Sequence, residues 1–205
     1  CRRDGRWIHY DSTHGLASYF VLTIHEDLTG RLWFGTTHGL CWFADGVFVA
    51  ETLPGMNDRR YVSAITRDRD GRLWVGTDGD GLFVQHNGRT TRIDEGSGLP
   101  GNQVRALCLD PSGQVWAATN RGLARFANGE PAATPLPPEL AAGDVRALQV
   151  DHQGSVWIGS GDGMLYRYRE GELDRVAIHG GIPNNSVYAI REDQEGSLWL
   201  GTYRS

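Results

Sequence analysis

The chain has 205 residues, of which 40% are hydrophobic and 22% charged, and a formal net charge of −5. This balance excludes a disordered tail and allows a globular body with its own core. All 20 cationic residues are arginines, which form no basic cluster, and no run of 18 apolar residues occurs. We therefore expect no nucleic-acid partner and no direct membrane insertion of this segment.

A tetrad Gly-x-Leu/Val-Trp recurs along the chain, with its tryptophans 41, 42, 41 and 42 residues apart. An aspartate stands three positions before each glycine of the tetrad. Asp-x-x-Gly between two apolar runs predicts a tight hairpin, because Asp bonds the backbone at the start of the turn and Gly accepts the left-handed conformation at its end. The aspartates are Asp27, Asp68, Asp110, Asp151 and Asp193, and the tryptophans are Trp33, Trp74, Trp116, Trp157 and Trp199.

Each unit predicts four short strands. In the second unit, a first apolar segment at 62–65 carries a small residue at its third position, and a second segment at 73–77 follows the turn through Trp to Gly-Thr. A third strand opens at Gly81-Leu82, and a fourth follows a polar turn that ends at Gly88. Apolar positions alternate or run over short lengths, so no segment has a helical period.

Four strands in a repeat of 41–42 residues predict an all-β fold, a β-propeller of four-stranded antiparallel blades. Stacked blades bury each other's apolar faces, small residues fit where strands crowd near the axis, and Trp fills the wedge between blades farther out. We expect the blades at residues 19–60, 61–102, 103–143, 144–185, and 186–205 together with 1–18.

The two ends of the chain have the patterns of complementary half-blades. Residues 1–10 match a third and a fourth strand, and residues 201–205 stop after a second strand. We expect the N-terminal strands to complete the last blade, which makes residues 1–205 a single five-bladed domain. The alternatives are a five-blade fragment of a longer propeller array, and a homo-oligomer or ring formed by exchange of blades.

The pattern Val-x-Ala-Ile-x-x-Asp-x-x-Gly-x-Leu-Trp-Val-Gly-Thr-x-x-Gly-Leu, nearly intact at 62–82 and again at 187–202, resembles the two-component regulator propeller repeat. Gly-Leu-Pro-Gly-Asn-Gln-Val at 98–104, echoed at 181–187, resembles that family's connection into the next blade. The resemblance implies a non-enzymatic sensor region of a bacterial membrane receptor, periplasmic or extracellular, whose ligands are often glycan fragments.

Three segments depart from the family pattern. Ala-Ala-Thr at 117–119 replaces Val-Gly-Thr, and Gly-Ser at 159–160 replaces Gly-Thr. A proline-rich stretch at 130–138 takes the place of the Gly-Leu-Pro connection, which affects the outer strand of one blade.

One face of the propeller is the candidate binding face. The loops from second to third strands and from one blade to the next emerge there, and their residues differ between units, whereas the Asp-x-x-Gly hairpins opposite are alike. The positions that enter and open the first strands vary in the same way: Phe20 and Leu22, Tyr61 and Ser63, Gln103 and Arg105, Asp144 and Arg146, Ser186 and Tyr188. Positions free of structural constraint can carry specificity. The candidate ligand-binding residues are His38, Tyr61, Asp78, Asp80, Arg105, Arg121, Arg146, Asp162, Tyr188, Tyr203 and Arg204.

Aromatic rings with Arg and Asp suit a polyhydroxylated or anionic ligand, because rings stack on sugar faces and charged groups bind hydroxyls or carboxylates. We expect a sensory module that binds an oligosaccharide or another small polar ligand. The alternatives are a rigid scaffold for a protein partner or for dimerisation, a propeller lyase or hydrolase built on His38, and a face whose loop residues only pair with one another.

No nucleophile, base and orienting group stand at a recognised spacing, so we expect no catalytic residue. Asp-x-Asp-Gly at 68–71 and 78–81 begins like a calcium loop but lacks the further oxygen ligands. We therefore expect no metal and no cofactor.

Overall fold

The computed structural model describes residues 2–3, 5–56, 60–132, 136–177 and 186–202. Four of its sheets have four antiparallel strands each, in chain order. The first sheet is β3 (Val21–Glu26), β4 (Leu32–Thr36), β5 (Gly39–Ala44) and β6 (Val47–Glu51). The second is β7 (Val62–Arg67), β8 (Leu73–Thr77), β9 (Leu82–His86) and β10 (Arg89–Ile93). The third is β11 (Val104–Leu109), β12 (Val115–Thr119), β13 (Gly122–Ala127) and β14 (Glu130–Pro131). The fourth is β15 (Val145–Val150), β16 (Val156–Ser160), β17 (Leu165–Arg169) and β18 (Glu172–Val176).

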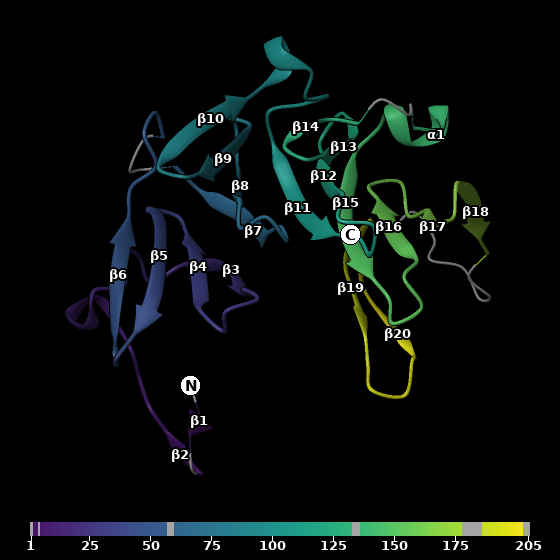
Figure 1. Cartoon of the computed structure of the whole chain (residues 1–205). Coiled ribbons are helices and arrows are strands. Elements are labelled where there is room, and N and C mark those ends of the chain that lie inside the picture. Colours follow the sequence, from purple (N-terminus) through teal and green to yellow (C-terminus); the bar gives the residue numbers. More distant parts are fainter. Residues whose placement is uncertain (1, 4, 57–59, 133–135, 178–185, 203–205) are drawn as a thin grey trace.

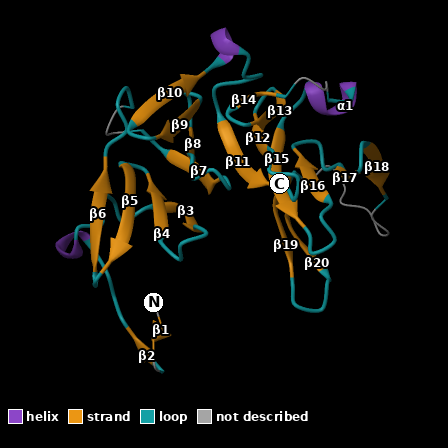
Figure 2. Ribbon diagram, viewed as in Figure 1, coloured by secondary structure: helices purple, strands orange, loops and turns teal. Residues whose placement is uncertain are grey.

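Two further sheets have two strands each and lie near the ends of the chain. They are β1 (Arg2–Arg3) with β2 (Arg6–Trp7), and β19 (Val187–Glu192) with β20 (Leu198–Thr202). The short helices are η1 (Ser12–His14), η2 (Glu95–Ser97) and α1 (Pro138–Ala141). The expected all-β fold of four-stranded antiparallel sheets is confirmed, and strands dominate Figure 2.

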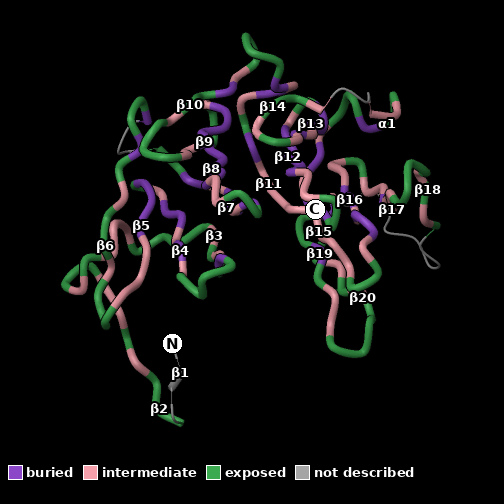
Figure 3. The backbone as a smooth tube through the Cα atoms, in the orientation of Figure 1, coloured by how far each residue is buried: buried purple, intermediate pink, exposed green. Residues whose placement is uncertain are grey.

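The sheets follow one another along an open arc (Figure 1). Their first strands pack side by side in the order β3, β7, β11, β15 and β19, so these strands line the inside of the arc. The buried segments lie mostly in the second and third sheets, and the two ends of the arc carry mostly exposed residues (Figure 3).

The expected pairing of the chain's two ends is not found among the described residues. The strands β1 and β2 pair with each other, β20 pairs with β19, and the two hairpins lie on opposite sides of the opening in the arc (Figure 1). Closure of the ring therefore stays a prediction, as does the division of the chain into five blades of one domain.

The proline-rich stretch shortens the outer edge of the third sheet. The strand β14 has two residues, and because Pro131 has no N–H it cannot extend the ladder as a donor. The helix α1 follows, with Pro138 in its first turn, and its Leu140 is buried in a cluster with Trp116. A helical turn thus replaces the expected connection between the third and fourth sheets.

Each Asp-x-x-Gly turn is tied to the tryptophan that follows it. In the third sheet, one carboxylate oxygen of Asp110 accepts a hydrogen bond from the backbone N–H of Gln114 at 2.9 Å, and the other accepts one from Trp116 Nε1 at 2.8 Å. The same indole bond recurs in the other sheets, from Trp33 (3.0 Å), Trp74 (3.0 Å), Trp157 (2.8 Å) and Trp199 (2.7 Å) to the aspartates six residues earlier. The predicted Asp turns are therefore present, and each aspartate also fixes an indole ring.

These indoles pack between neighbouring sheets. Trp33 belongs to a buried cluster with Ile65 and Phe83 of the second sheet, and Trp74 to one with Val104 and Phe126 of the third. The second strand of one sheet also lies close to the first strand of the next. A Cβ built on Gly76 would lie 2.5 Å from Val104 Cγ1, so glycine at this position of β8 allows the contact.

Polar contacts also join the sheets. Arg67 of the second sheet donates to Asp27 of the first at 2.9 Å. Burial raises the pKa of Asp27, but the hydrogen bonds from Thr29, Trp33 and Arg67 together outweigh it, so the pKa of this carboxyl lies below its usual range. The carboxylate therefore stays charged in its buried position, where the arginine balances it.

Replacing Asp110 with alanine should destabilise the fold by about 2 kcal/mol, because it leaves the buried indole N–H of Trp116 without an acceptor. The matched control is Asp193→Ala, which removes the same bond from Trp199, whose side chain is exposed to water. Urea unfolding should show a clearly smaller loss for Asp193→Ala. Equal losses for the two variants would mean that the bond matters only for the turn.

The side chain of His152 should titrate above its ordinary pKa. Its hydrogen bond and charge interaction with Glu192 of the neighbouring sheet raise the pKa of the imidazole. The pair stabilises the folded chain fully below pH about 6.5, and this contribution is lost as the pH rises through the raised value. NMR titration of the His152 ring measures the pKa of the imidazole. Glu192→Gln should return the pKa toward 6.5, whereas the exposed Glu172→Gln should leave it raised.

Candidate functional site

In five sheets, those that begin with β3, β7, β11, β15 and β19, a β-bulge interrupts the first strand at its second residue. In the second sheet Val62 pairs with Thr77 and Ala64 with Gly76, so Ser63 is the extra residue between them. The same shift of register occurs in the other sheets, and the extra residues are Leu22, Ser63, Arg105, Arg146 and Tyr188. A bulge residue leaves the ladder and its side chain is re-aimed. The bulges thus give each first strand one side chain that the ladder does not fix.

These five bulge residues all line one cavity of about 580 Å³ inside the arc of first strands. Tyr61, Asp78, Gln103 and Val104 complete its lining. Of the candidate residues, the structure therefore brings together Tyr61, Asp78, Arg105, Arg146 and Tyr188. We call this space the axial cavity.

One carboxylate holds the two arginines of the axial cavity. Asp144 accepts from Arg146 Nε and Nη2 at 2.7 Å each, and lies 3.0 Å from Arg105 Nε. The guanidinium carbon of Arg146 lies 4.5 Å from the centroid of the Tyr188 ring, a cation–π distance. The two arginines thus share one carboxylate, and Asp78 brings a second carboxylate to the same lining.

The rim of the cavity is fixed by a backbone contact that recurs in four sheets. The residue after Gly-Thr or its equivalent donates its N–H to the carbonyl of the residue that enters the first strand. The pairs are Thr37 with Phe20 (3.1 Å), Asp78 with Tyr61 (3.0 Å), Asn120 with Gln103 (3.1 Å) and Gly161 with Asp144 (2.7 Å). Asp78 and Tyr61 thus reach the cavity from backbone that is held in place.

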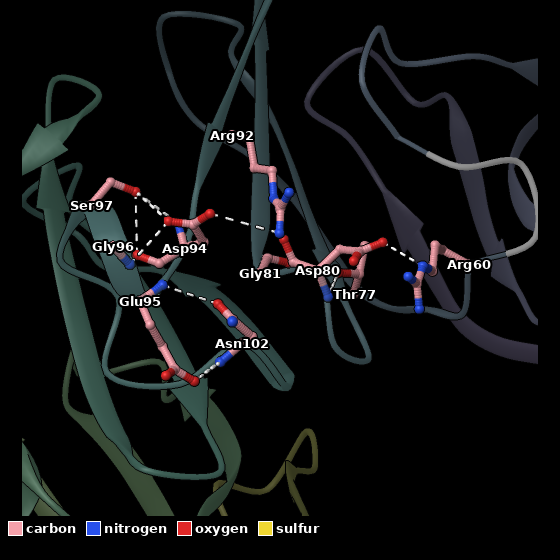
Figure 4. A network of polar contacts seen from close by, with 10 residues as sticks. All are labelled: Arg60, Thr77, Asp80, Gly81, Arg92, Asp94, Glu95, Gly96, Ser97 and Asn102. Atoms are coloured by element: carbon pink, nitrogen blue, oxygen red, sulfur yellow. Dashed lines mark hydrogen bonds and ion pairs between the residues drawn. The ribbon is translucent and has the colours of Figure 1, made fainter.

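Asp80 lies in a network that ties loops together instead (Figure 4). Its carboxylate forms an ion pair with Arg60, and its backbone carbonyl accepts from Arg92 Nε at 2.8 Å. Arg92 in turn pairs with Asp94, the cap of η2. Asp80 is thus one of the loop residues that pair with one another, and it does not line the axial cavity.

Three other candidates also lie outside the axial cavity. Arg121 pairs with Glu95 of η2 at 3.3 Å. Asp162 accepts from the backbone of Met164 at 3.3 Å and lines a separate cavity of about 320 Å³. The exposed His38 bonds to Thr37 at 3.1 Å through its ring. The remaining candidates, Tyr203 and Arg204, lie outside the described residues.

The candidate set left out Leu22, Ser63, Gln103 and Asp144, which line the axial cavity or hold its arginines. Each stands at one of the variable positions that enter or open the first strands, so the signal was present in the sequence. Ser63 is constrained as well, because its hydroxyl donates to Val104 O of the next sheet and to Gly76 O at 3.2 Å.

Histidine–carboxylate pairs occur in the described ranges, but away from the axial cavity. His14 lies 3.0 Å from Asp11 within the turn of η1, and His152 pairs with Glu192 between the fourth and the last sheet. Within the same ranges, no group of three or more His, Cys, Asp and Glu side chains could hold a metal ion.

Four segments of the chain match a family model described as two component regulator propeller: residues 55–79, 98–121, 139–162 and 181–204. Each segment runs from the end of one repeat into the next and includes the Asp-x-x-Gly turn and the Trp of the tetrad. No curated protein matches the chain.

Several solved structures share the fold. The extracellular domain described as that of a hybrid two component system from B. thetaiotaomicron has a TM-score of 0.78 and 21% identity, over 97% of this chain and 28% of that one. The extracellular domain described as that of a one component system from the same organism has a TM-score of 0.56 and 22% identity, over 89% of this chain and 31% of that one. A catalytically inactive virginiamycin B lyase from Staphylococcus aureus has a TM-score of 0.68 and 18% identity, over 88% of this chain and 62% of that one. The chain thus spans less than a third of the length of the first two structures.

Proposed function

Because this chain is built from repeats of the two component regulator propeller family, we propose that it is a ligand-binding sensory propeller of a bacterial receptor and that its ligand occupies the axial cavity. The observation that carries the proposal is the set of five bulges. Five sheets each contribute one side chain to the same 580 Å³ space, with aliphatic, hydroxyl, cationic and aromatic chemistry among them, on a framework that is otherwise repeated.

The proposed ligand is an oligosaccharide or another small polar molecule that carries hydroxyls and a negative charge. Arg105 and Arg146 share the single carboxylate of Asp144, so a carboxylate of the ligand would give these two guanidinium groups a second acceptor. The half-exposed rings of Tyr61 and Tyr188 offer stacking surfaces for sugar rings, and Asp78 can accept hydroxyl hydrogens.

We further propose that the module acts outside the cytoplasm. The similar hybrid and one component systems are extracellular domains by description, which supports this placement. None of the helices in the described ranges has the length and apolarity that a membrane crossing requires.

Ligand binding without catalysis fits the chemistry of the axial cavity. Its described lining contains no histidine or cysteine, and its arginines are bound to Asp144 or stacked on Tyr188. The likeness to the virginiamycin B lyase, at 18% identity, concerns the fold alone.

A protein-interaction scaffold is the second candidate function. It is favoured by large apolar side chains that lie exposed at the two ends of the arc, namely Ile24 and Trp199. Surfaces of this kind are common in protein–protein contacts.

Calorimetric titration with neutral oligosaccharides (cellotetraose, chitotetraose) and an acidic one (tetragalacturonate) tests the ligand proposal. We expect heat with the acidic member, and a loss of affinity of about tenfold or more for Arg146→Gln, because a charge-assisted bond to the ligand is removed. Tyr188→Ala should weaken binding in the same direction through the lost stacking surface.

The matched control is Arg121→Gln, since Arg121 lies on the same face but pairs with Glu95 outside the axial cavity. It should bind like the unmodified chain. Absence of heat with all three saccharides would overturn the glycan proposal, and an equal loss for Arg121→Gln would move the site to the outer loops.

A further inference from the structure

The charged groups of the axial cavity lie on two sides of it. Arg105 belongs to β11 and Arg146 to β15, whereas Asp78 follows β8 of the second sheet. The strand β11 packs between β7 and β15, so Asp78 belongs to the second-sheet side of the cavity and Arg146 to the fourth-sheet side. Together with Asp144, which binds both arginines, this region holds two positive and two negative charges. The charges therefore balance, but one carboxylate stands apart from the other three groups.

The loop that carries Asp78 is fixed by two neighbouring segments. Asp78 donates its backbone N–H to Tyr61 O at 3.0 Å, and its backbone also forms an isolated antiparallel bridge with Gln103. The next residue, Gly79, donates its N–H to Asn102 O at 3.1 Å. The Asp78 carboxylate therefore extends from backbone that is already ordered, which lowers the entropy cost of binding a ligand there.

The Asp78 carboxylate has no partner among the residues that the structure describes. No hydrogen bond or ion pair joins it to Arg105, Arg146 or another described residue. By contrast, the carboxylate of Asp80, two positions later in the same loop, is bound by Arg60. Both carboxylate oxygens of Asp78 are thus available as acceptors for a ligand in the cavity.

Each side of the cavity combines its charge with an aromatic ring. The half-exposed ring of Tyr188 lies against the guanidinium group of Arg146, and the half-exposed Tyr61 is joined to Asp78 through the backbone. Both tyrosines line the cavity. An ammonium group that pairs with Asp78 can therefore also lie against the ring of Tyr61, whose face attracts a cation. A hydroxyl group would gain less from this combination, so the second-sheet side favours a cation.

We propose that the ligand of the axial cavity is a zwitterionic saccharide, an amino sugar that also carries an acidic group. Asp78 binds its ammonium group, and Arg105 and Arg146 bind its carboxylate. This assignment rests on the proposed function, because it takes the axial cavity as the ligand site, and it adds a positive charge to the ligand. A saccharide with a carboxylate alone would leave Asp78 without a counter-charge. One with an ammonium group alone would offer the arginines no second acceptor.

Four monosaccharides with the same ring separate the effects of the two charges. Muramic acid carries an ammonium group and a carboxylate, N-acetylmuramic acid only the carboxylate, glucosamine only the ammonium group, and N-acetylglucosamine neither. NMR titration of the chain with each sugar, at a mildly acidic pH that keeps the amines protonated, gives the dissociation constants. We expect muramic acid to bind most tightly, about fivefold more tightly than N-acetylmuramic acid, which is the gain from one partly exposed ion pair.

The variant Asp78→Asn should remove this preference, because the amide keeps the shape of the side chain but not its charge. Its binding of N-acetylmuramic acid should not weaken. Asp162→Asn is the matched control, since Asp162 lies in the corresponding loop of the fourth sheet and outside the axial cavity. Its Oδ1, which accepts the N–H of Met164, remains an acceptor in asparagine. This variant should keep the preference for muramic acid.

Equal binding of muramic acid and N-acetylmuramic acid by the unmodified chain would overturn the zwitterion proposal. The proposed function would then stand, with the axial cavity as a site for acidic saccharides. A preference that survives in Asp78→Asn would overturn the assignment of the ammonium group to Asp78. Failure of muramic acid to bind would also overturn the proposal, and the tetrasaccharide titrations would decide separately whether the cavity binds a glycan.

Discussion

The fold depends on the hydrogen bonds that one aspartate makes in each of the five sheets that carry an Asp-x-x-Gly turn. One of its carboxylate oxygens fixes the turn between the first two strands, and the other fixes the indole that packs against the next sheet. A local turn and a contact between sheets are thus set by the same side chain. Because this arrangement recurs at each repeat, neighbouring sheets meet in the same way, and their first strands come together around a common axis.

The axial cavity follows from a second repeated feature. The strands β3, β7, β11, β15 and β19 each carry one extra residue at the second position, so five side chains of four kinds reach the same space while the ladders on either side are kept. The charge there is arranged by contacts between sheets: Asp144 binds Arg105 of the preceding sheet as well as Arg146 of its own. The chemistry of the cavity is therefore a property of the arc and not of any single blade.

Much of this architecture could be predicted from the sequence, because the spacing of the tryptophans and the Asp-x-x-Gly turns are local signals. The bulges could not be predicted from the sequence, because a shift of register such as that at Ser63 depends on how two strands pair. For the same reason Asp80 and Arg121 were grouped with Arg146, although their loops direct them to Arg60 and Glu95. The pairing of the two ends was expected from matching patterns, but whether such halves meet depends on the curvature of the whole arc.

The bulges have a consequence for how the lining of the axial cavity can change. A residue outside the ladder can be exchanged without altering the pairing of its neighbours, and the indole and turn that support the sheet lie at its other end. Duplication of a repeat followed by a single codon change would thus yield a new combination of cavity-lining groups on an old framework. Chains built from such repeats could thus differ in the groups that line the cavity with little loss of folding stability.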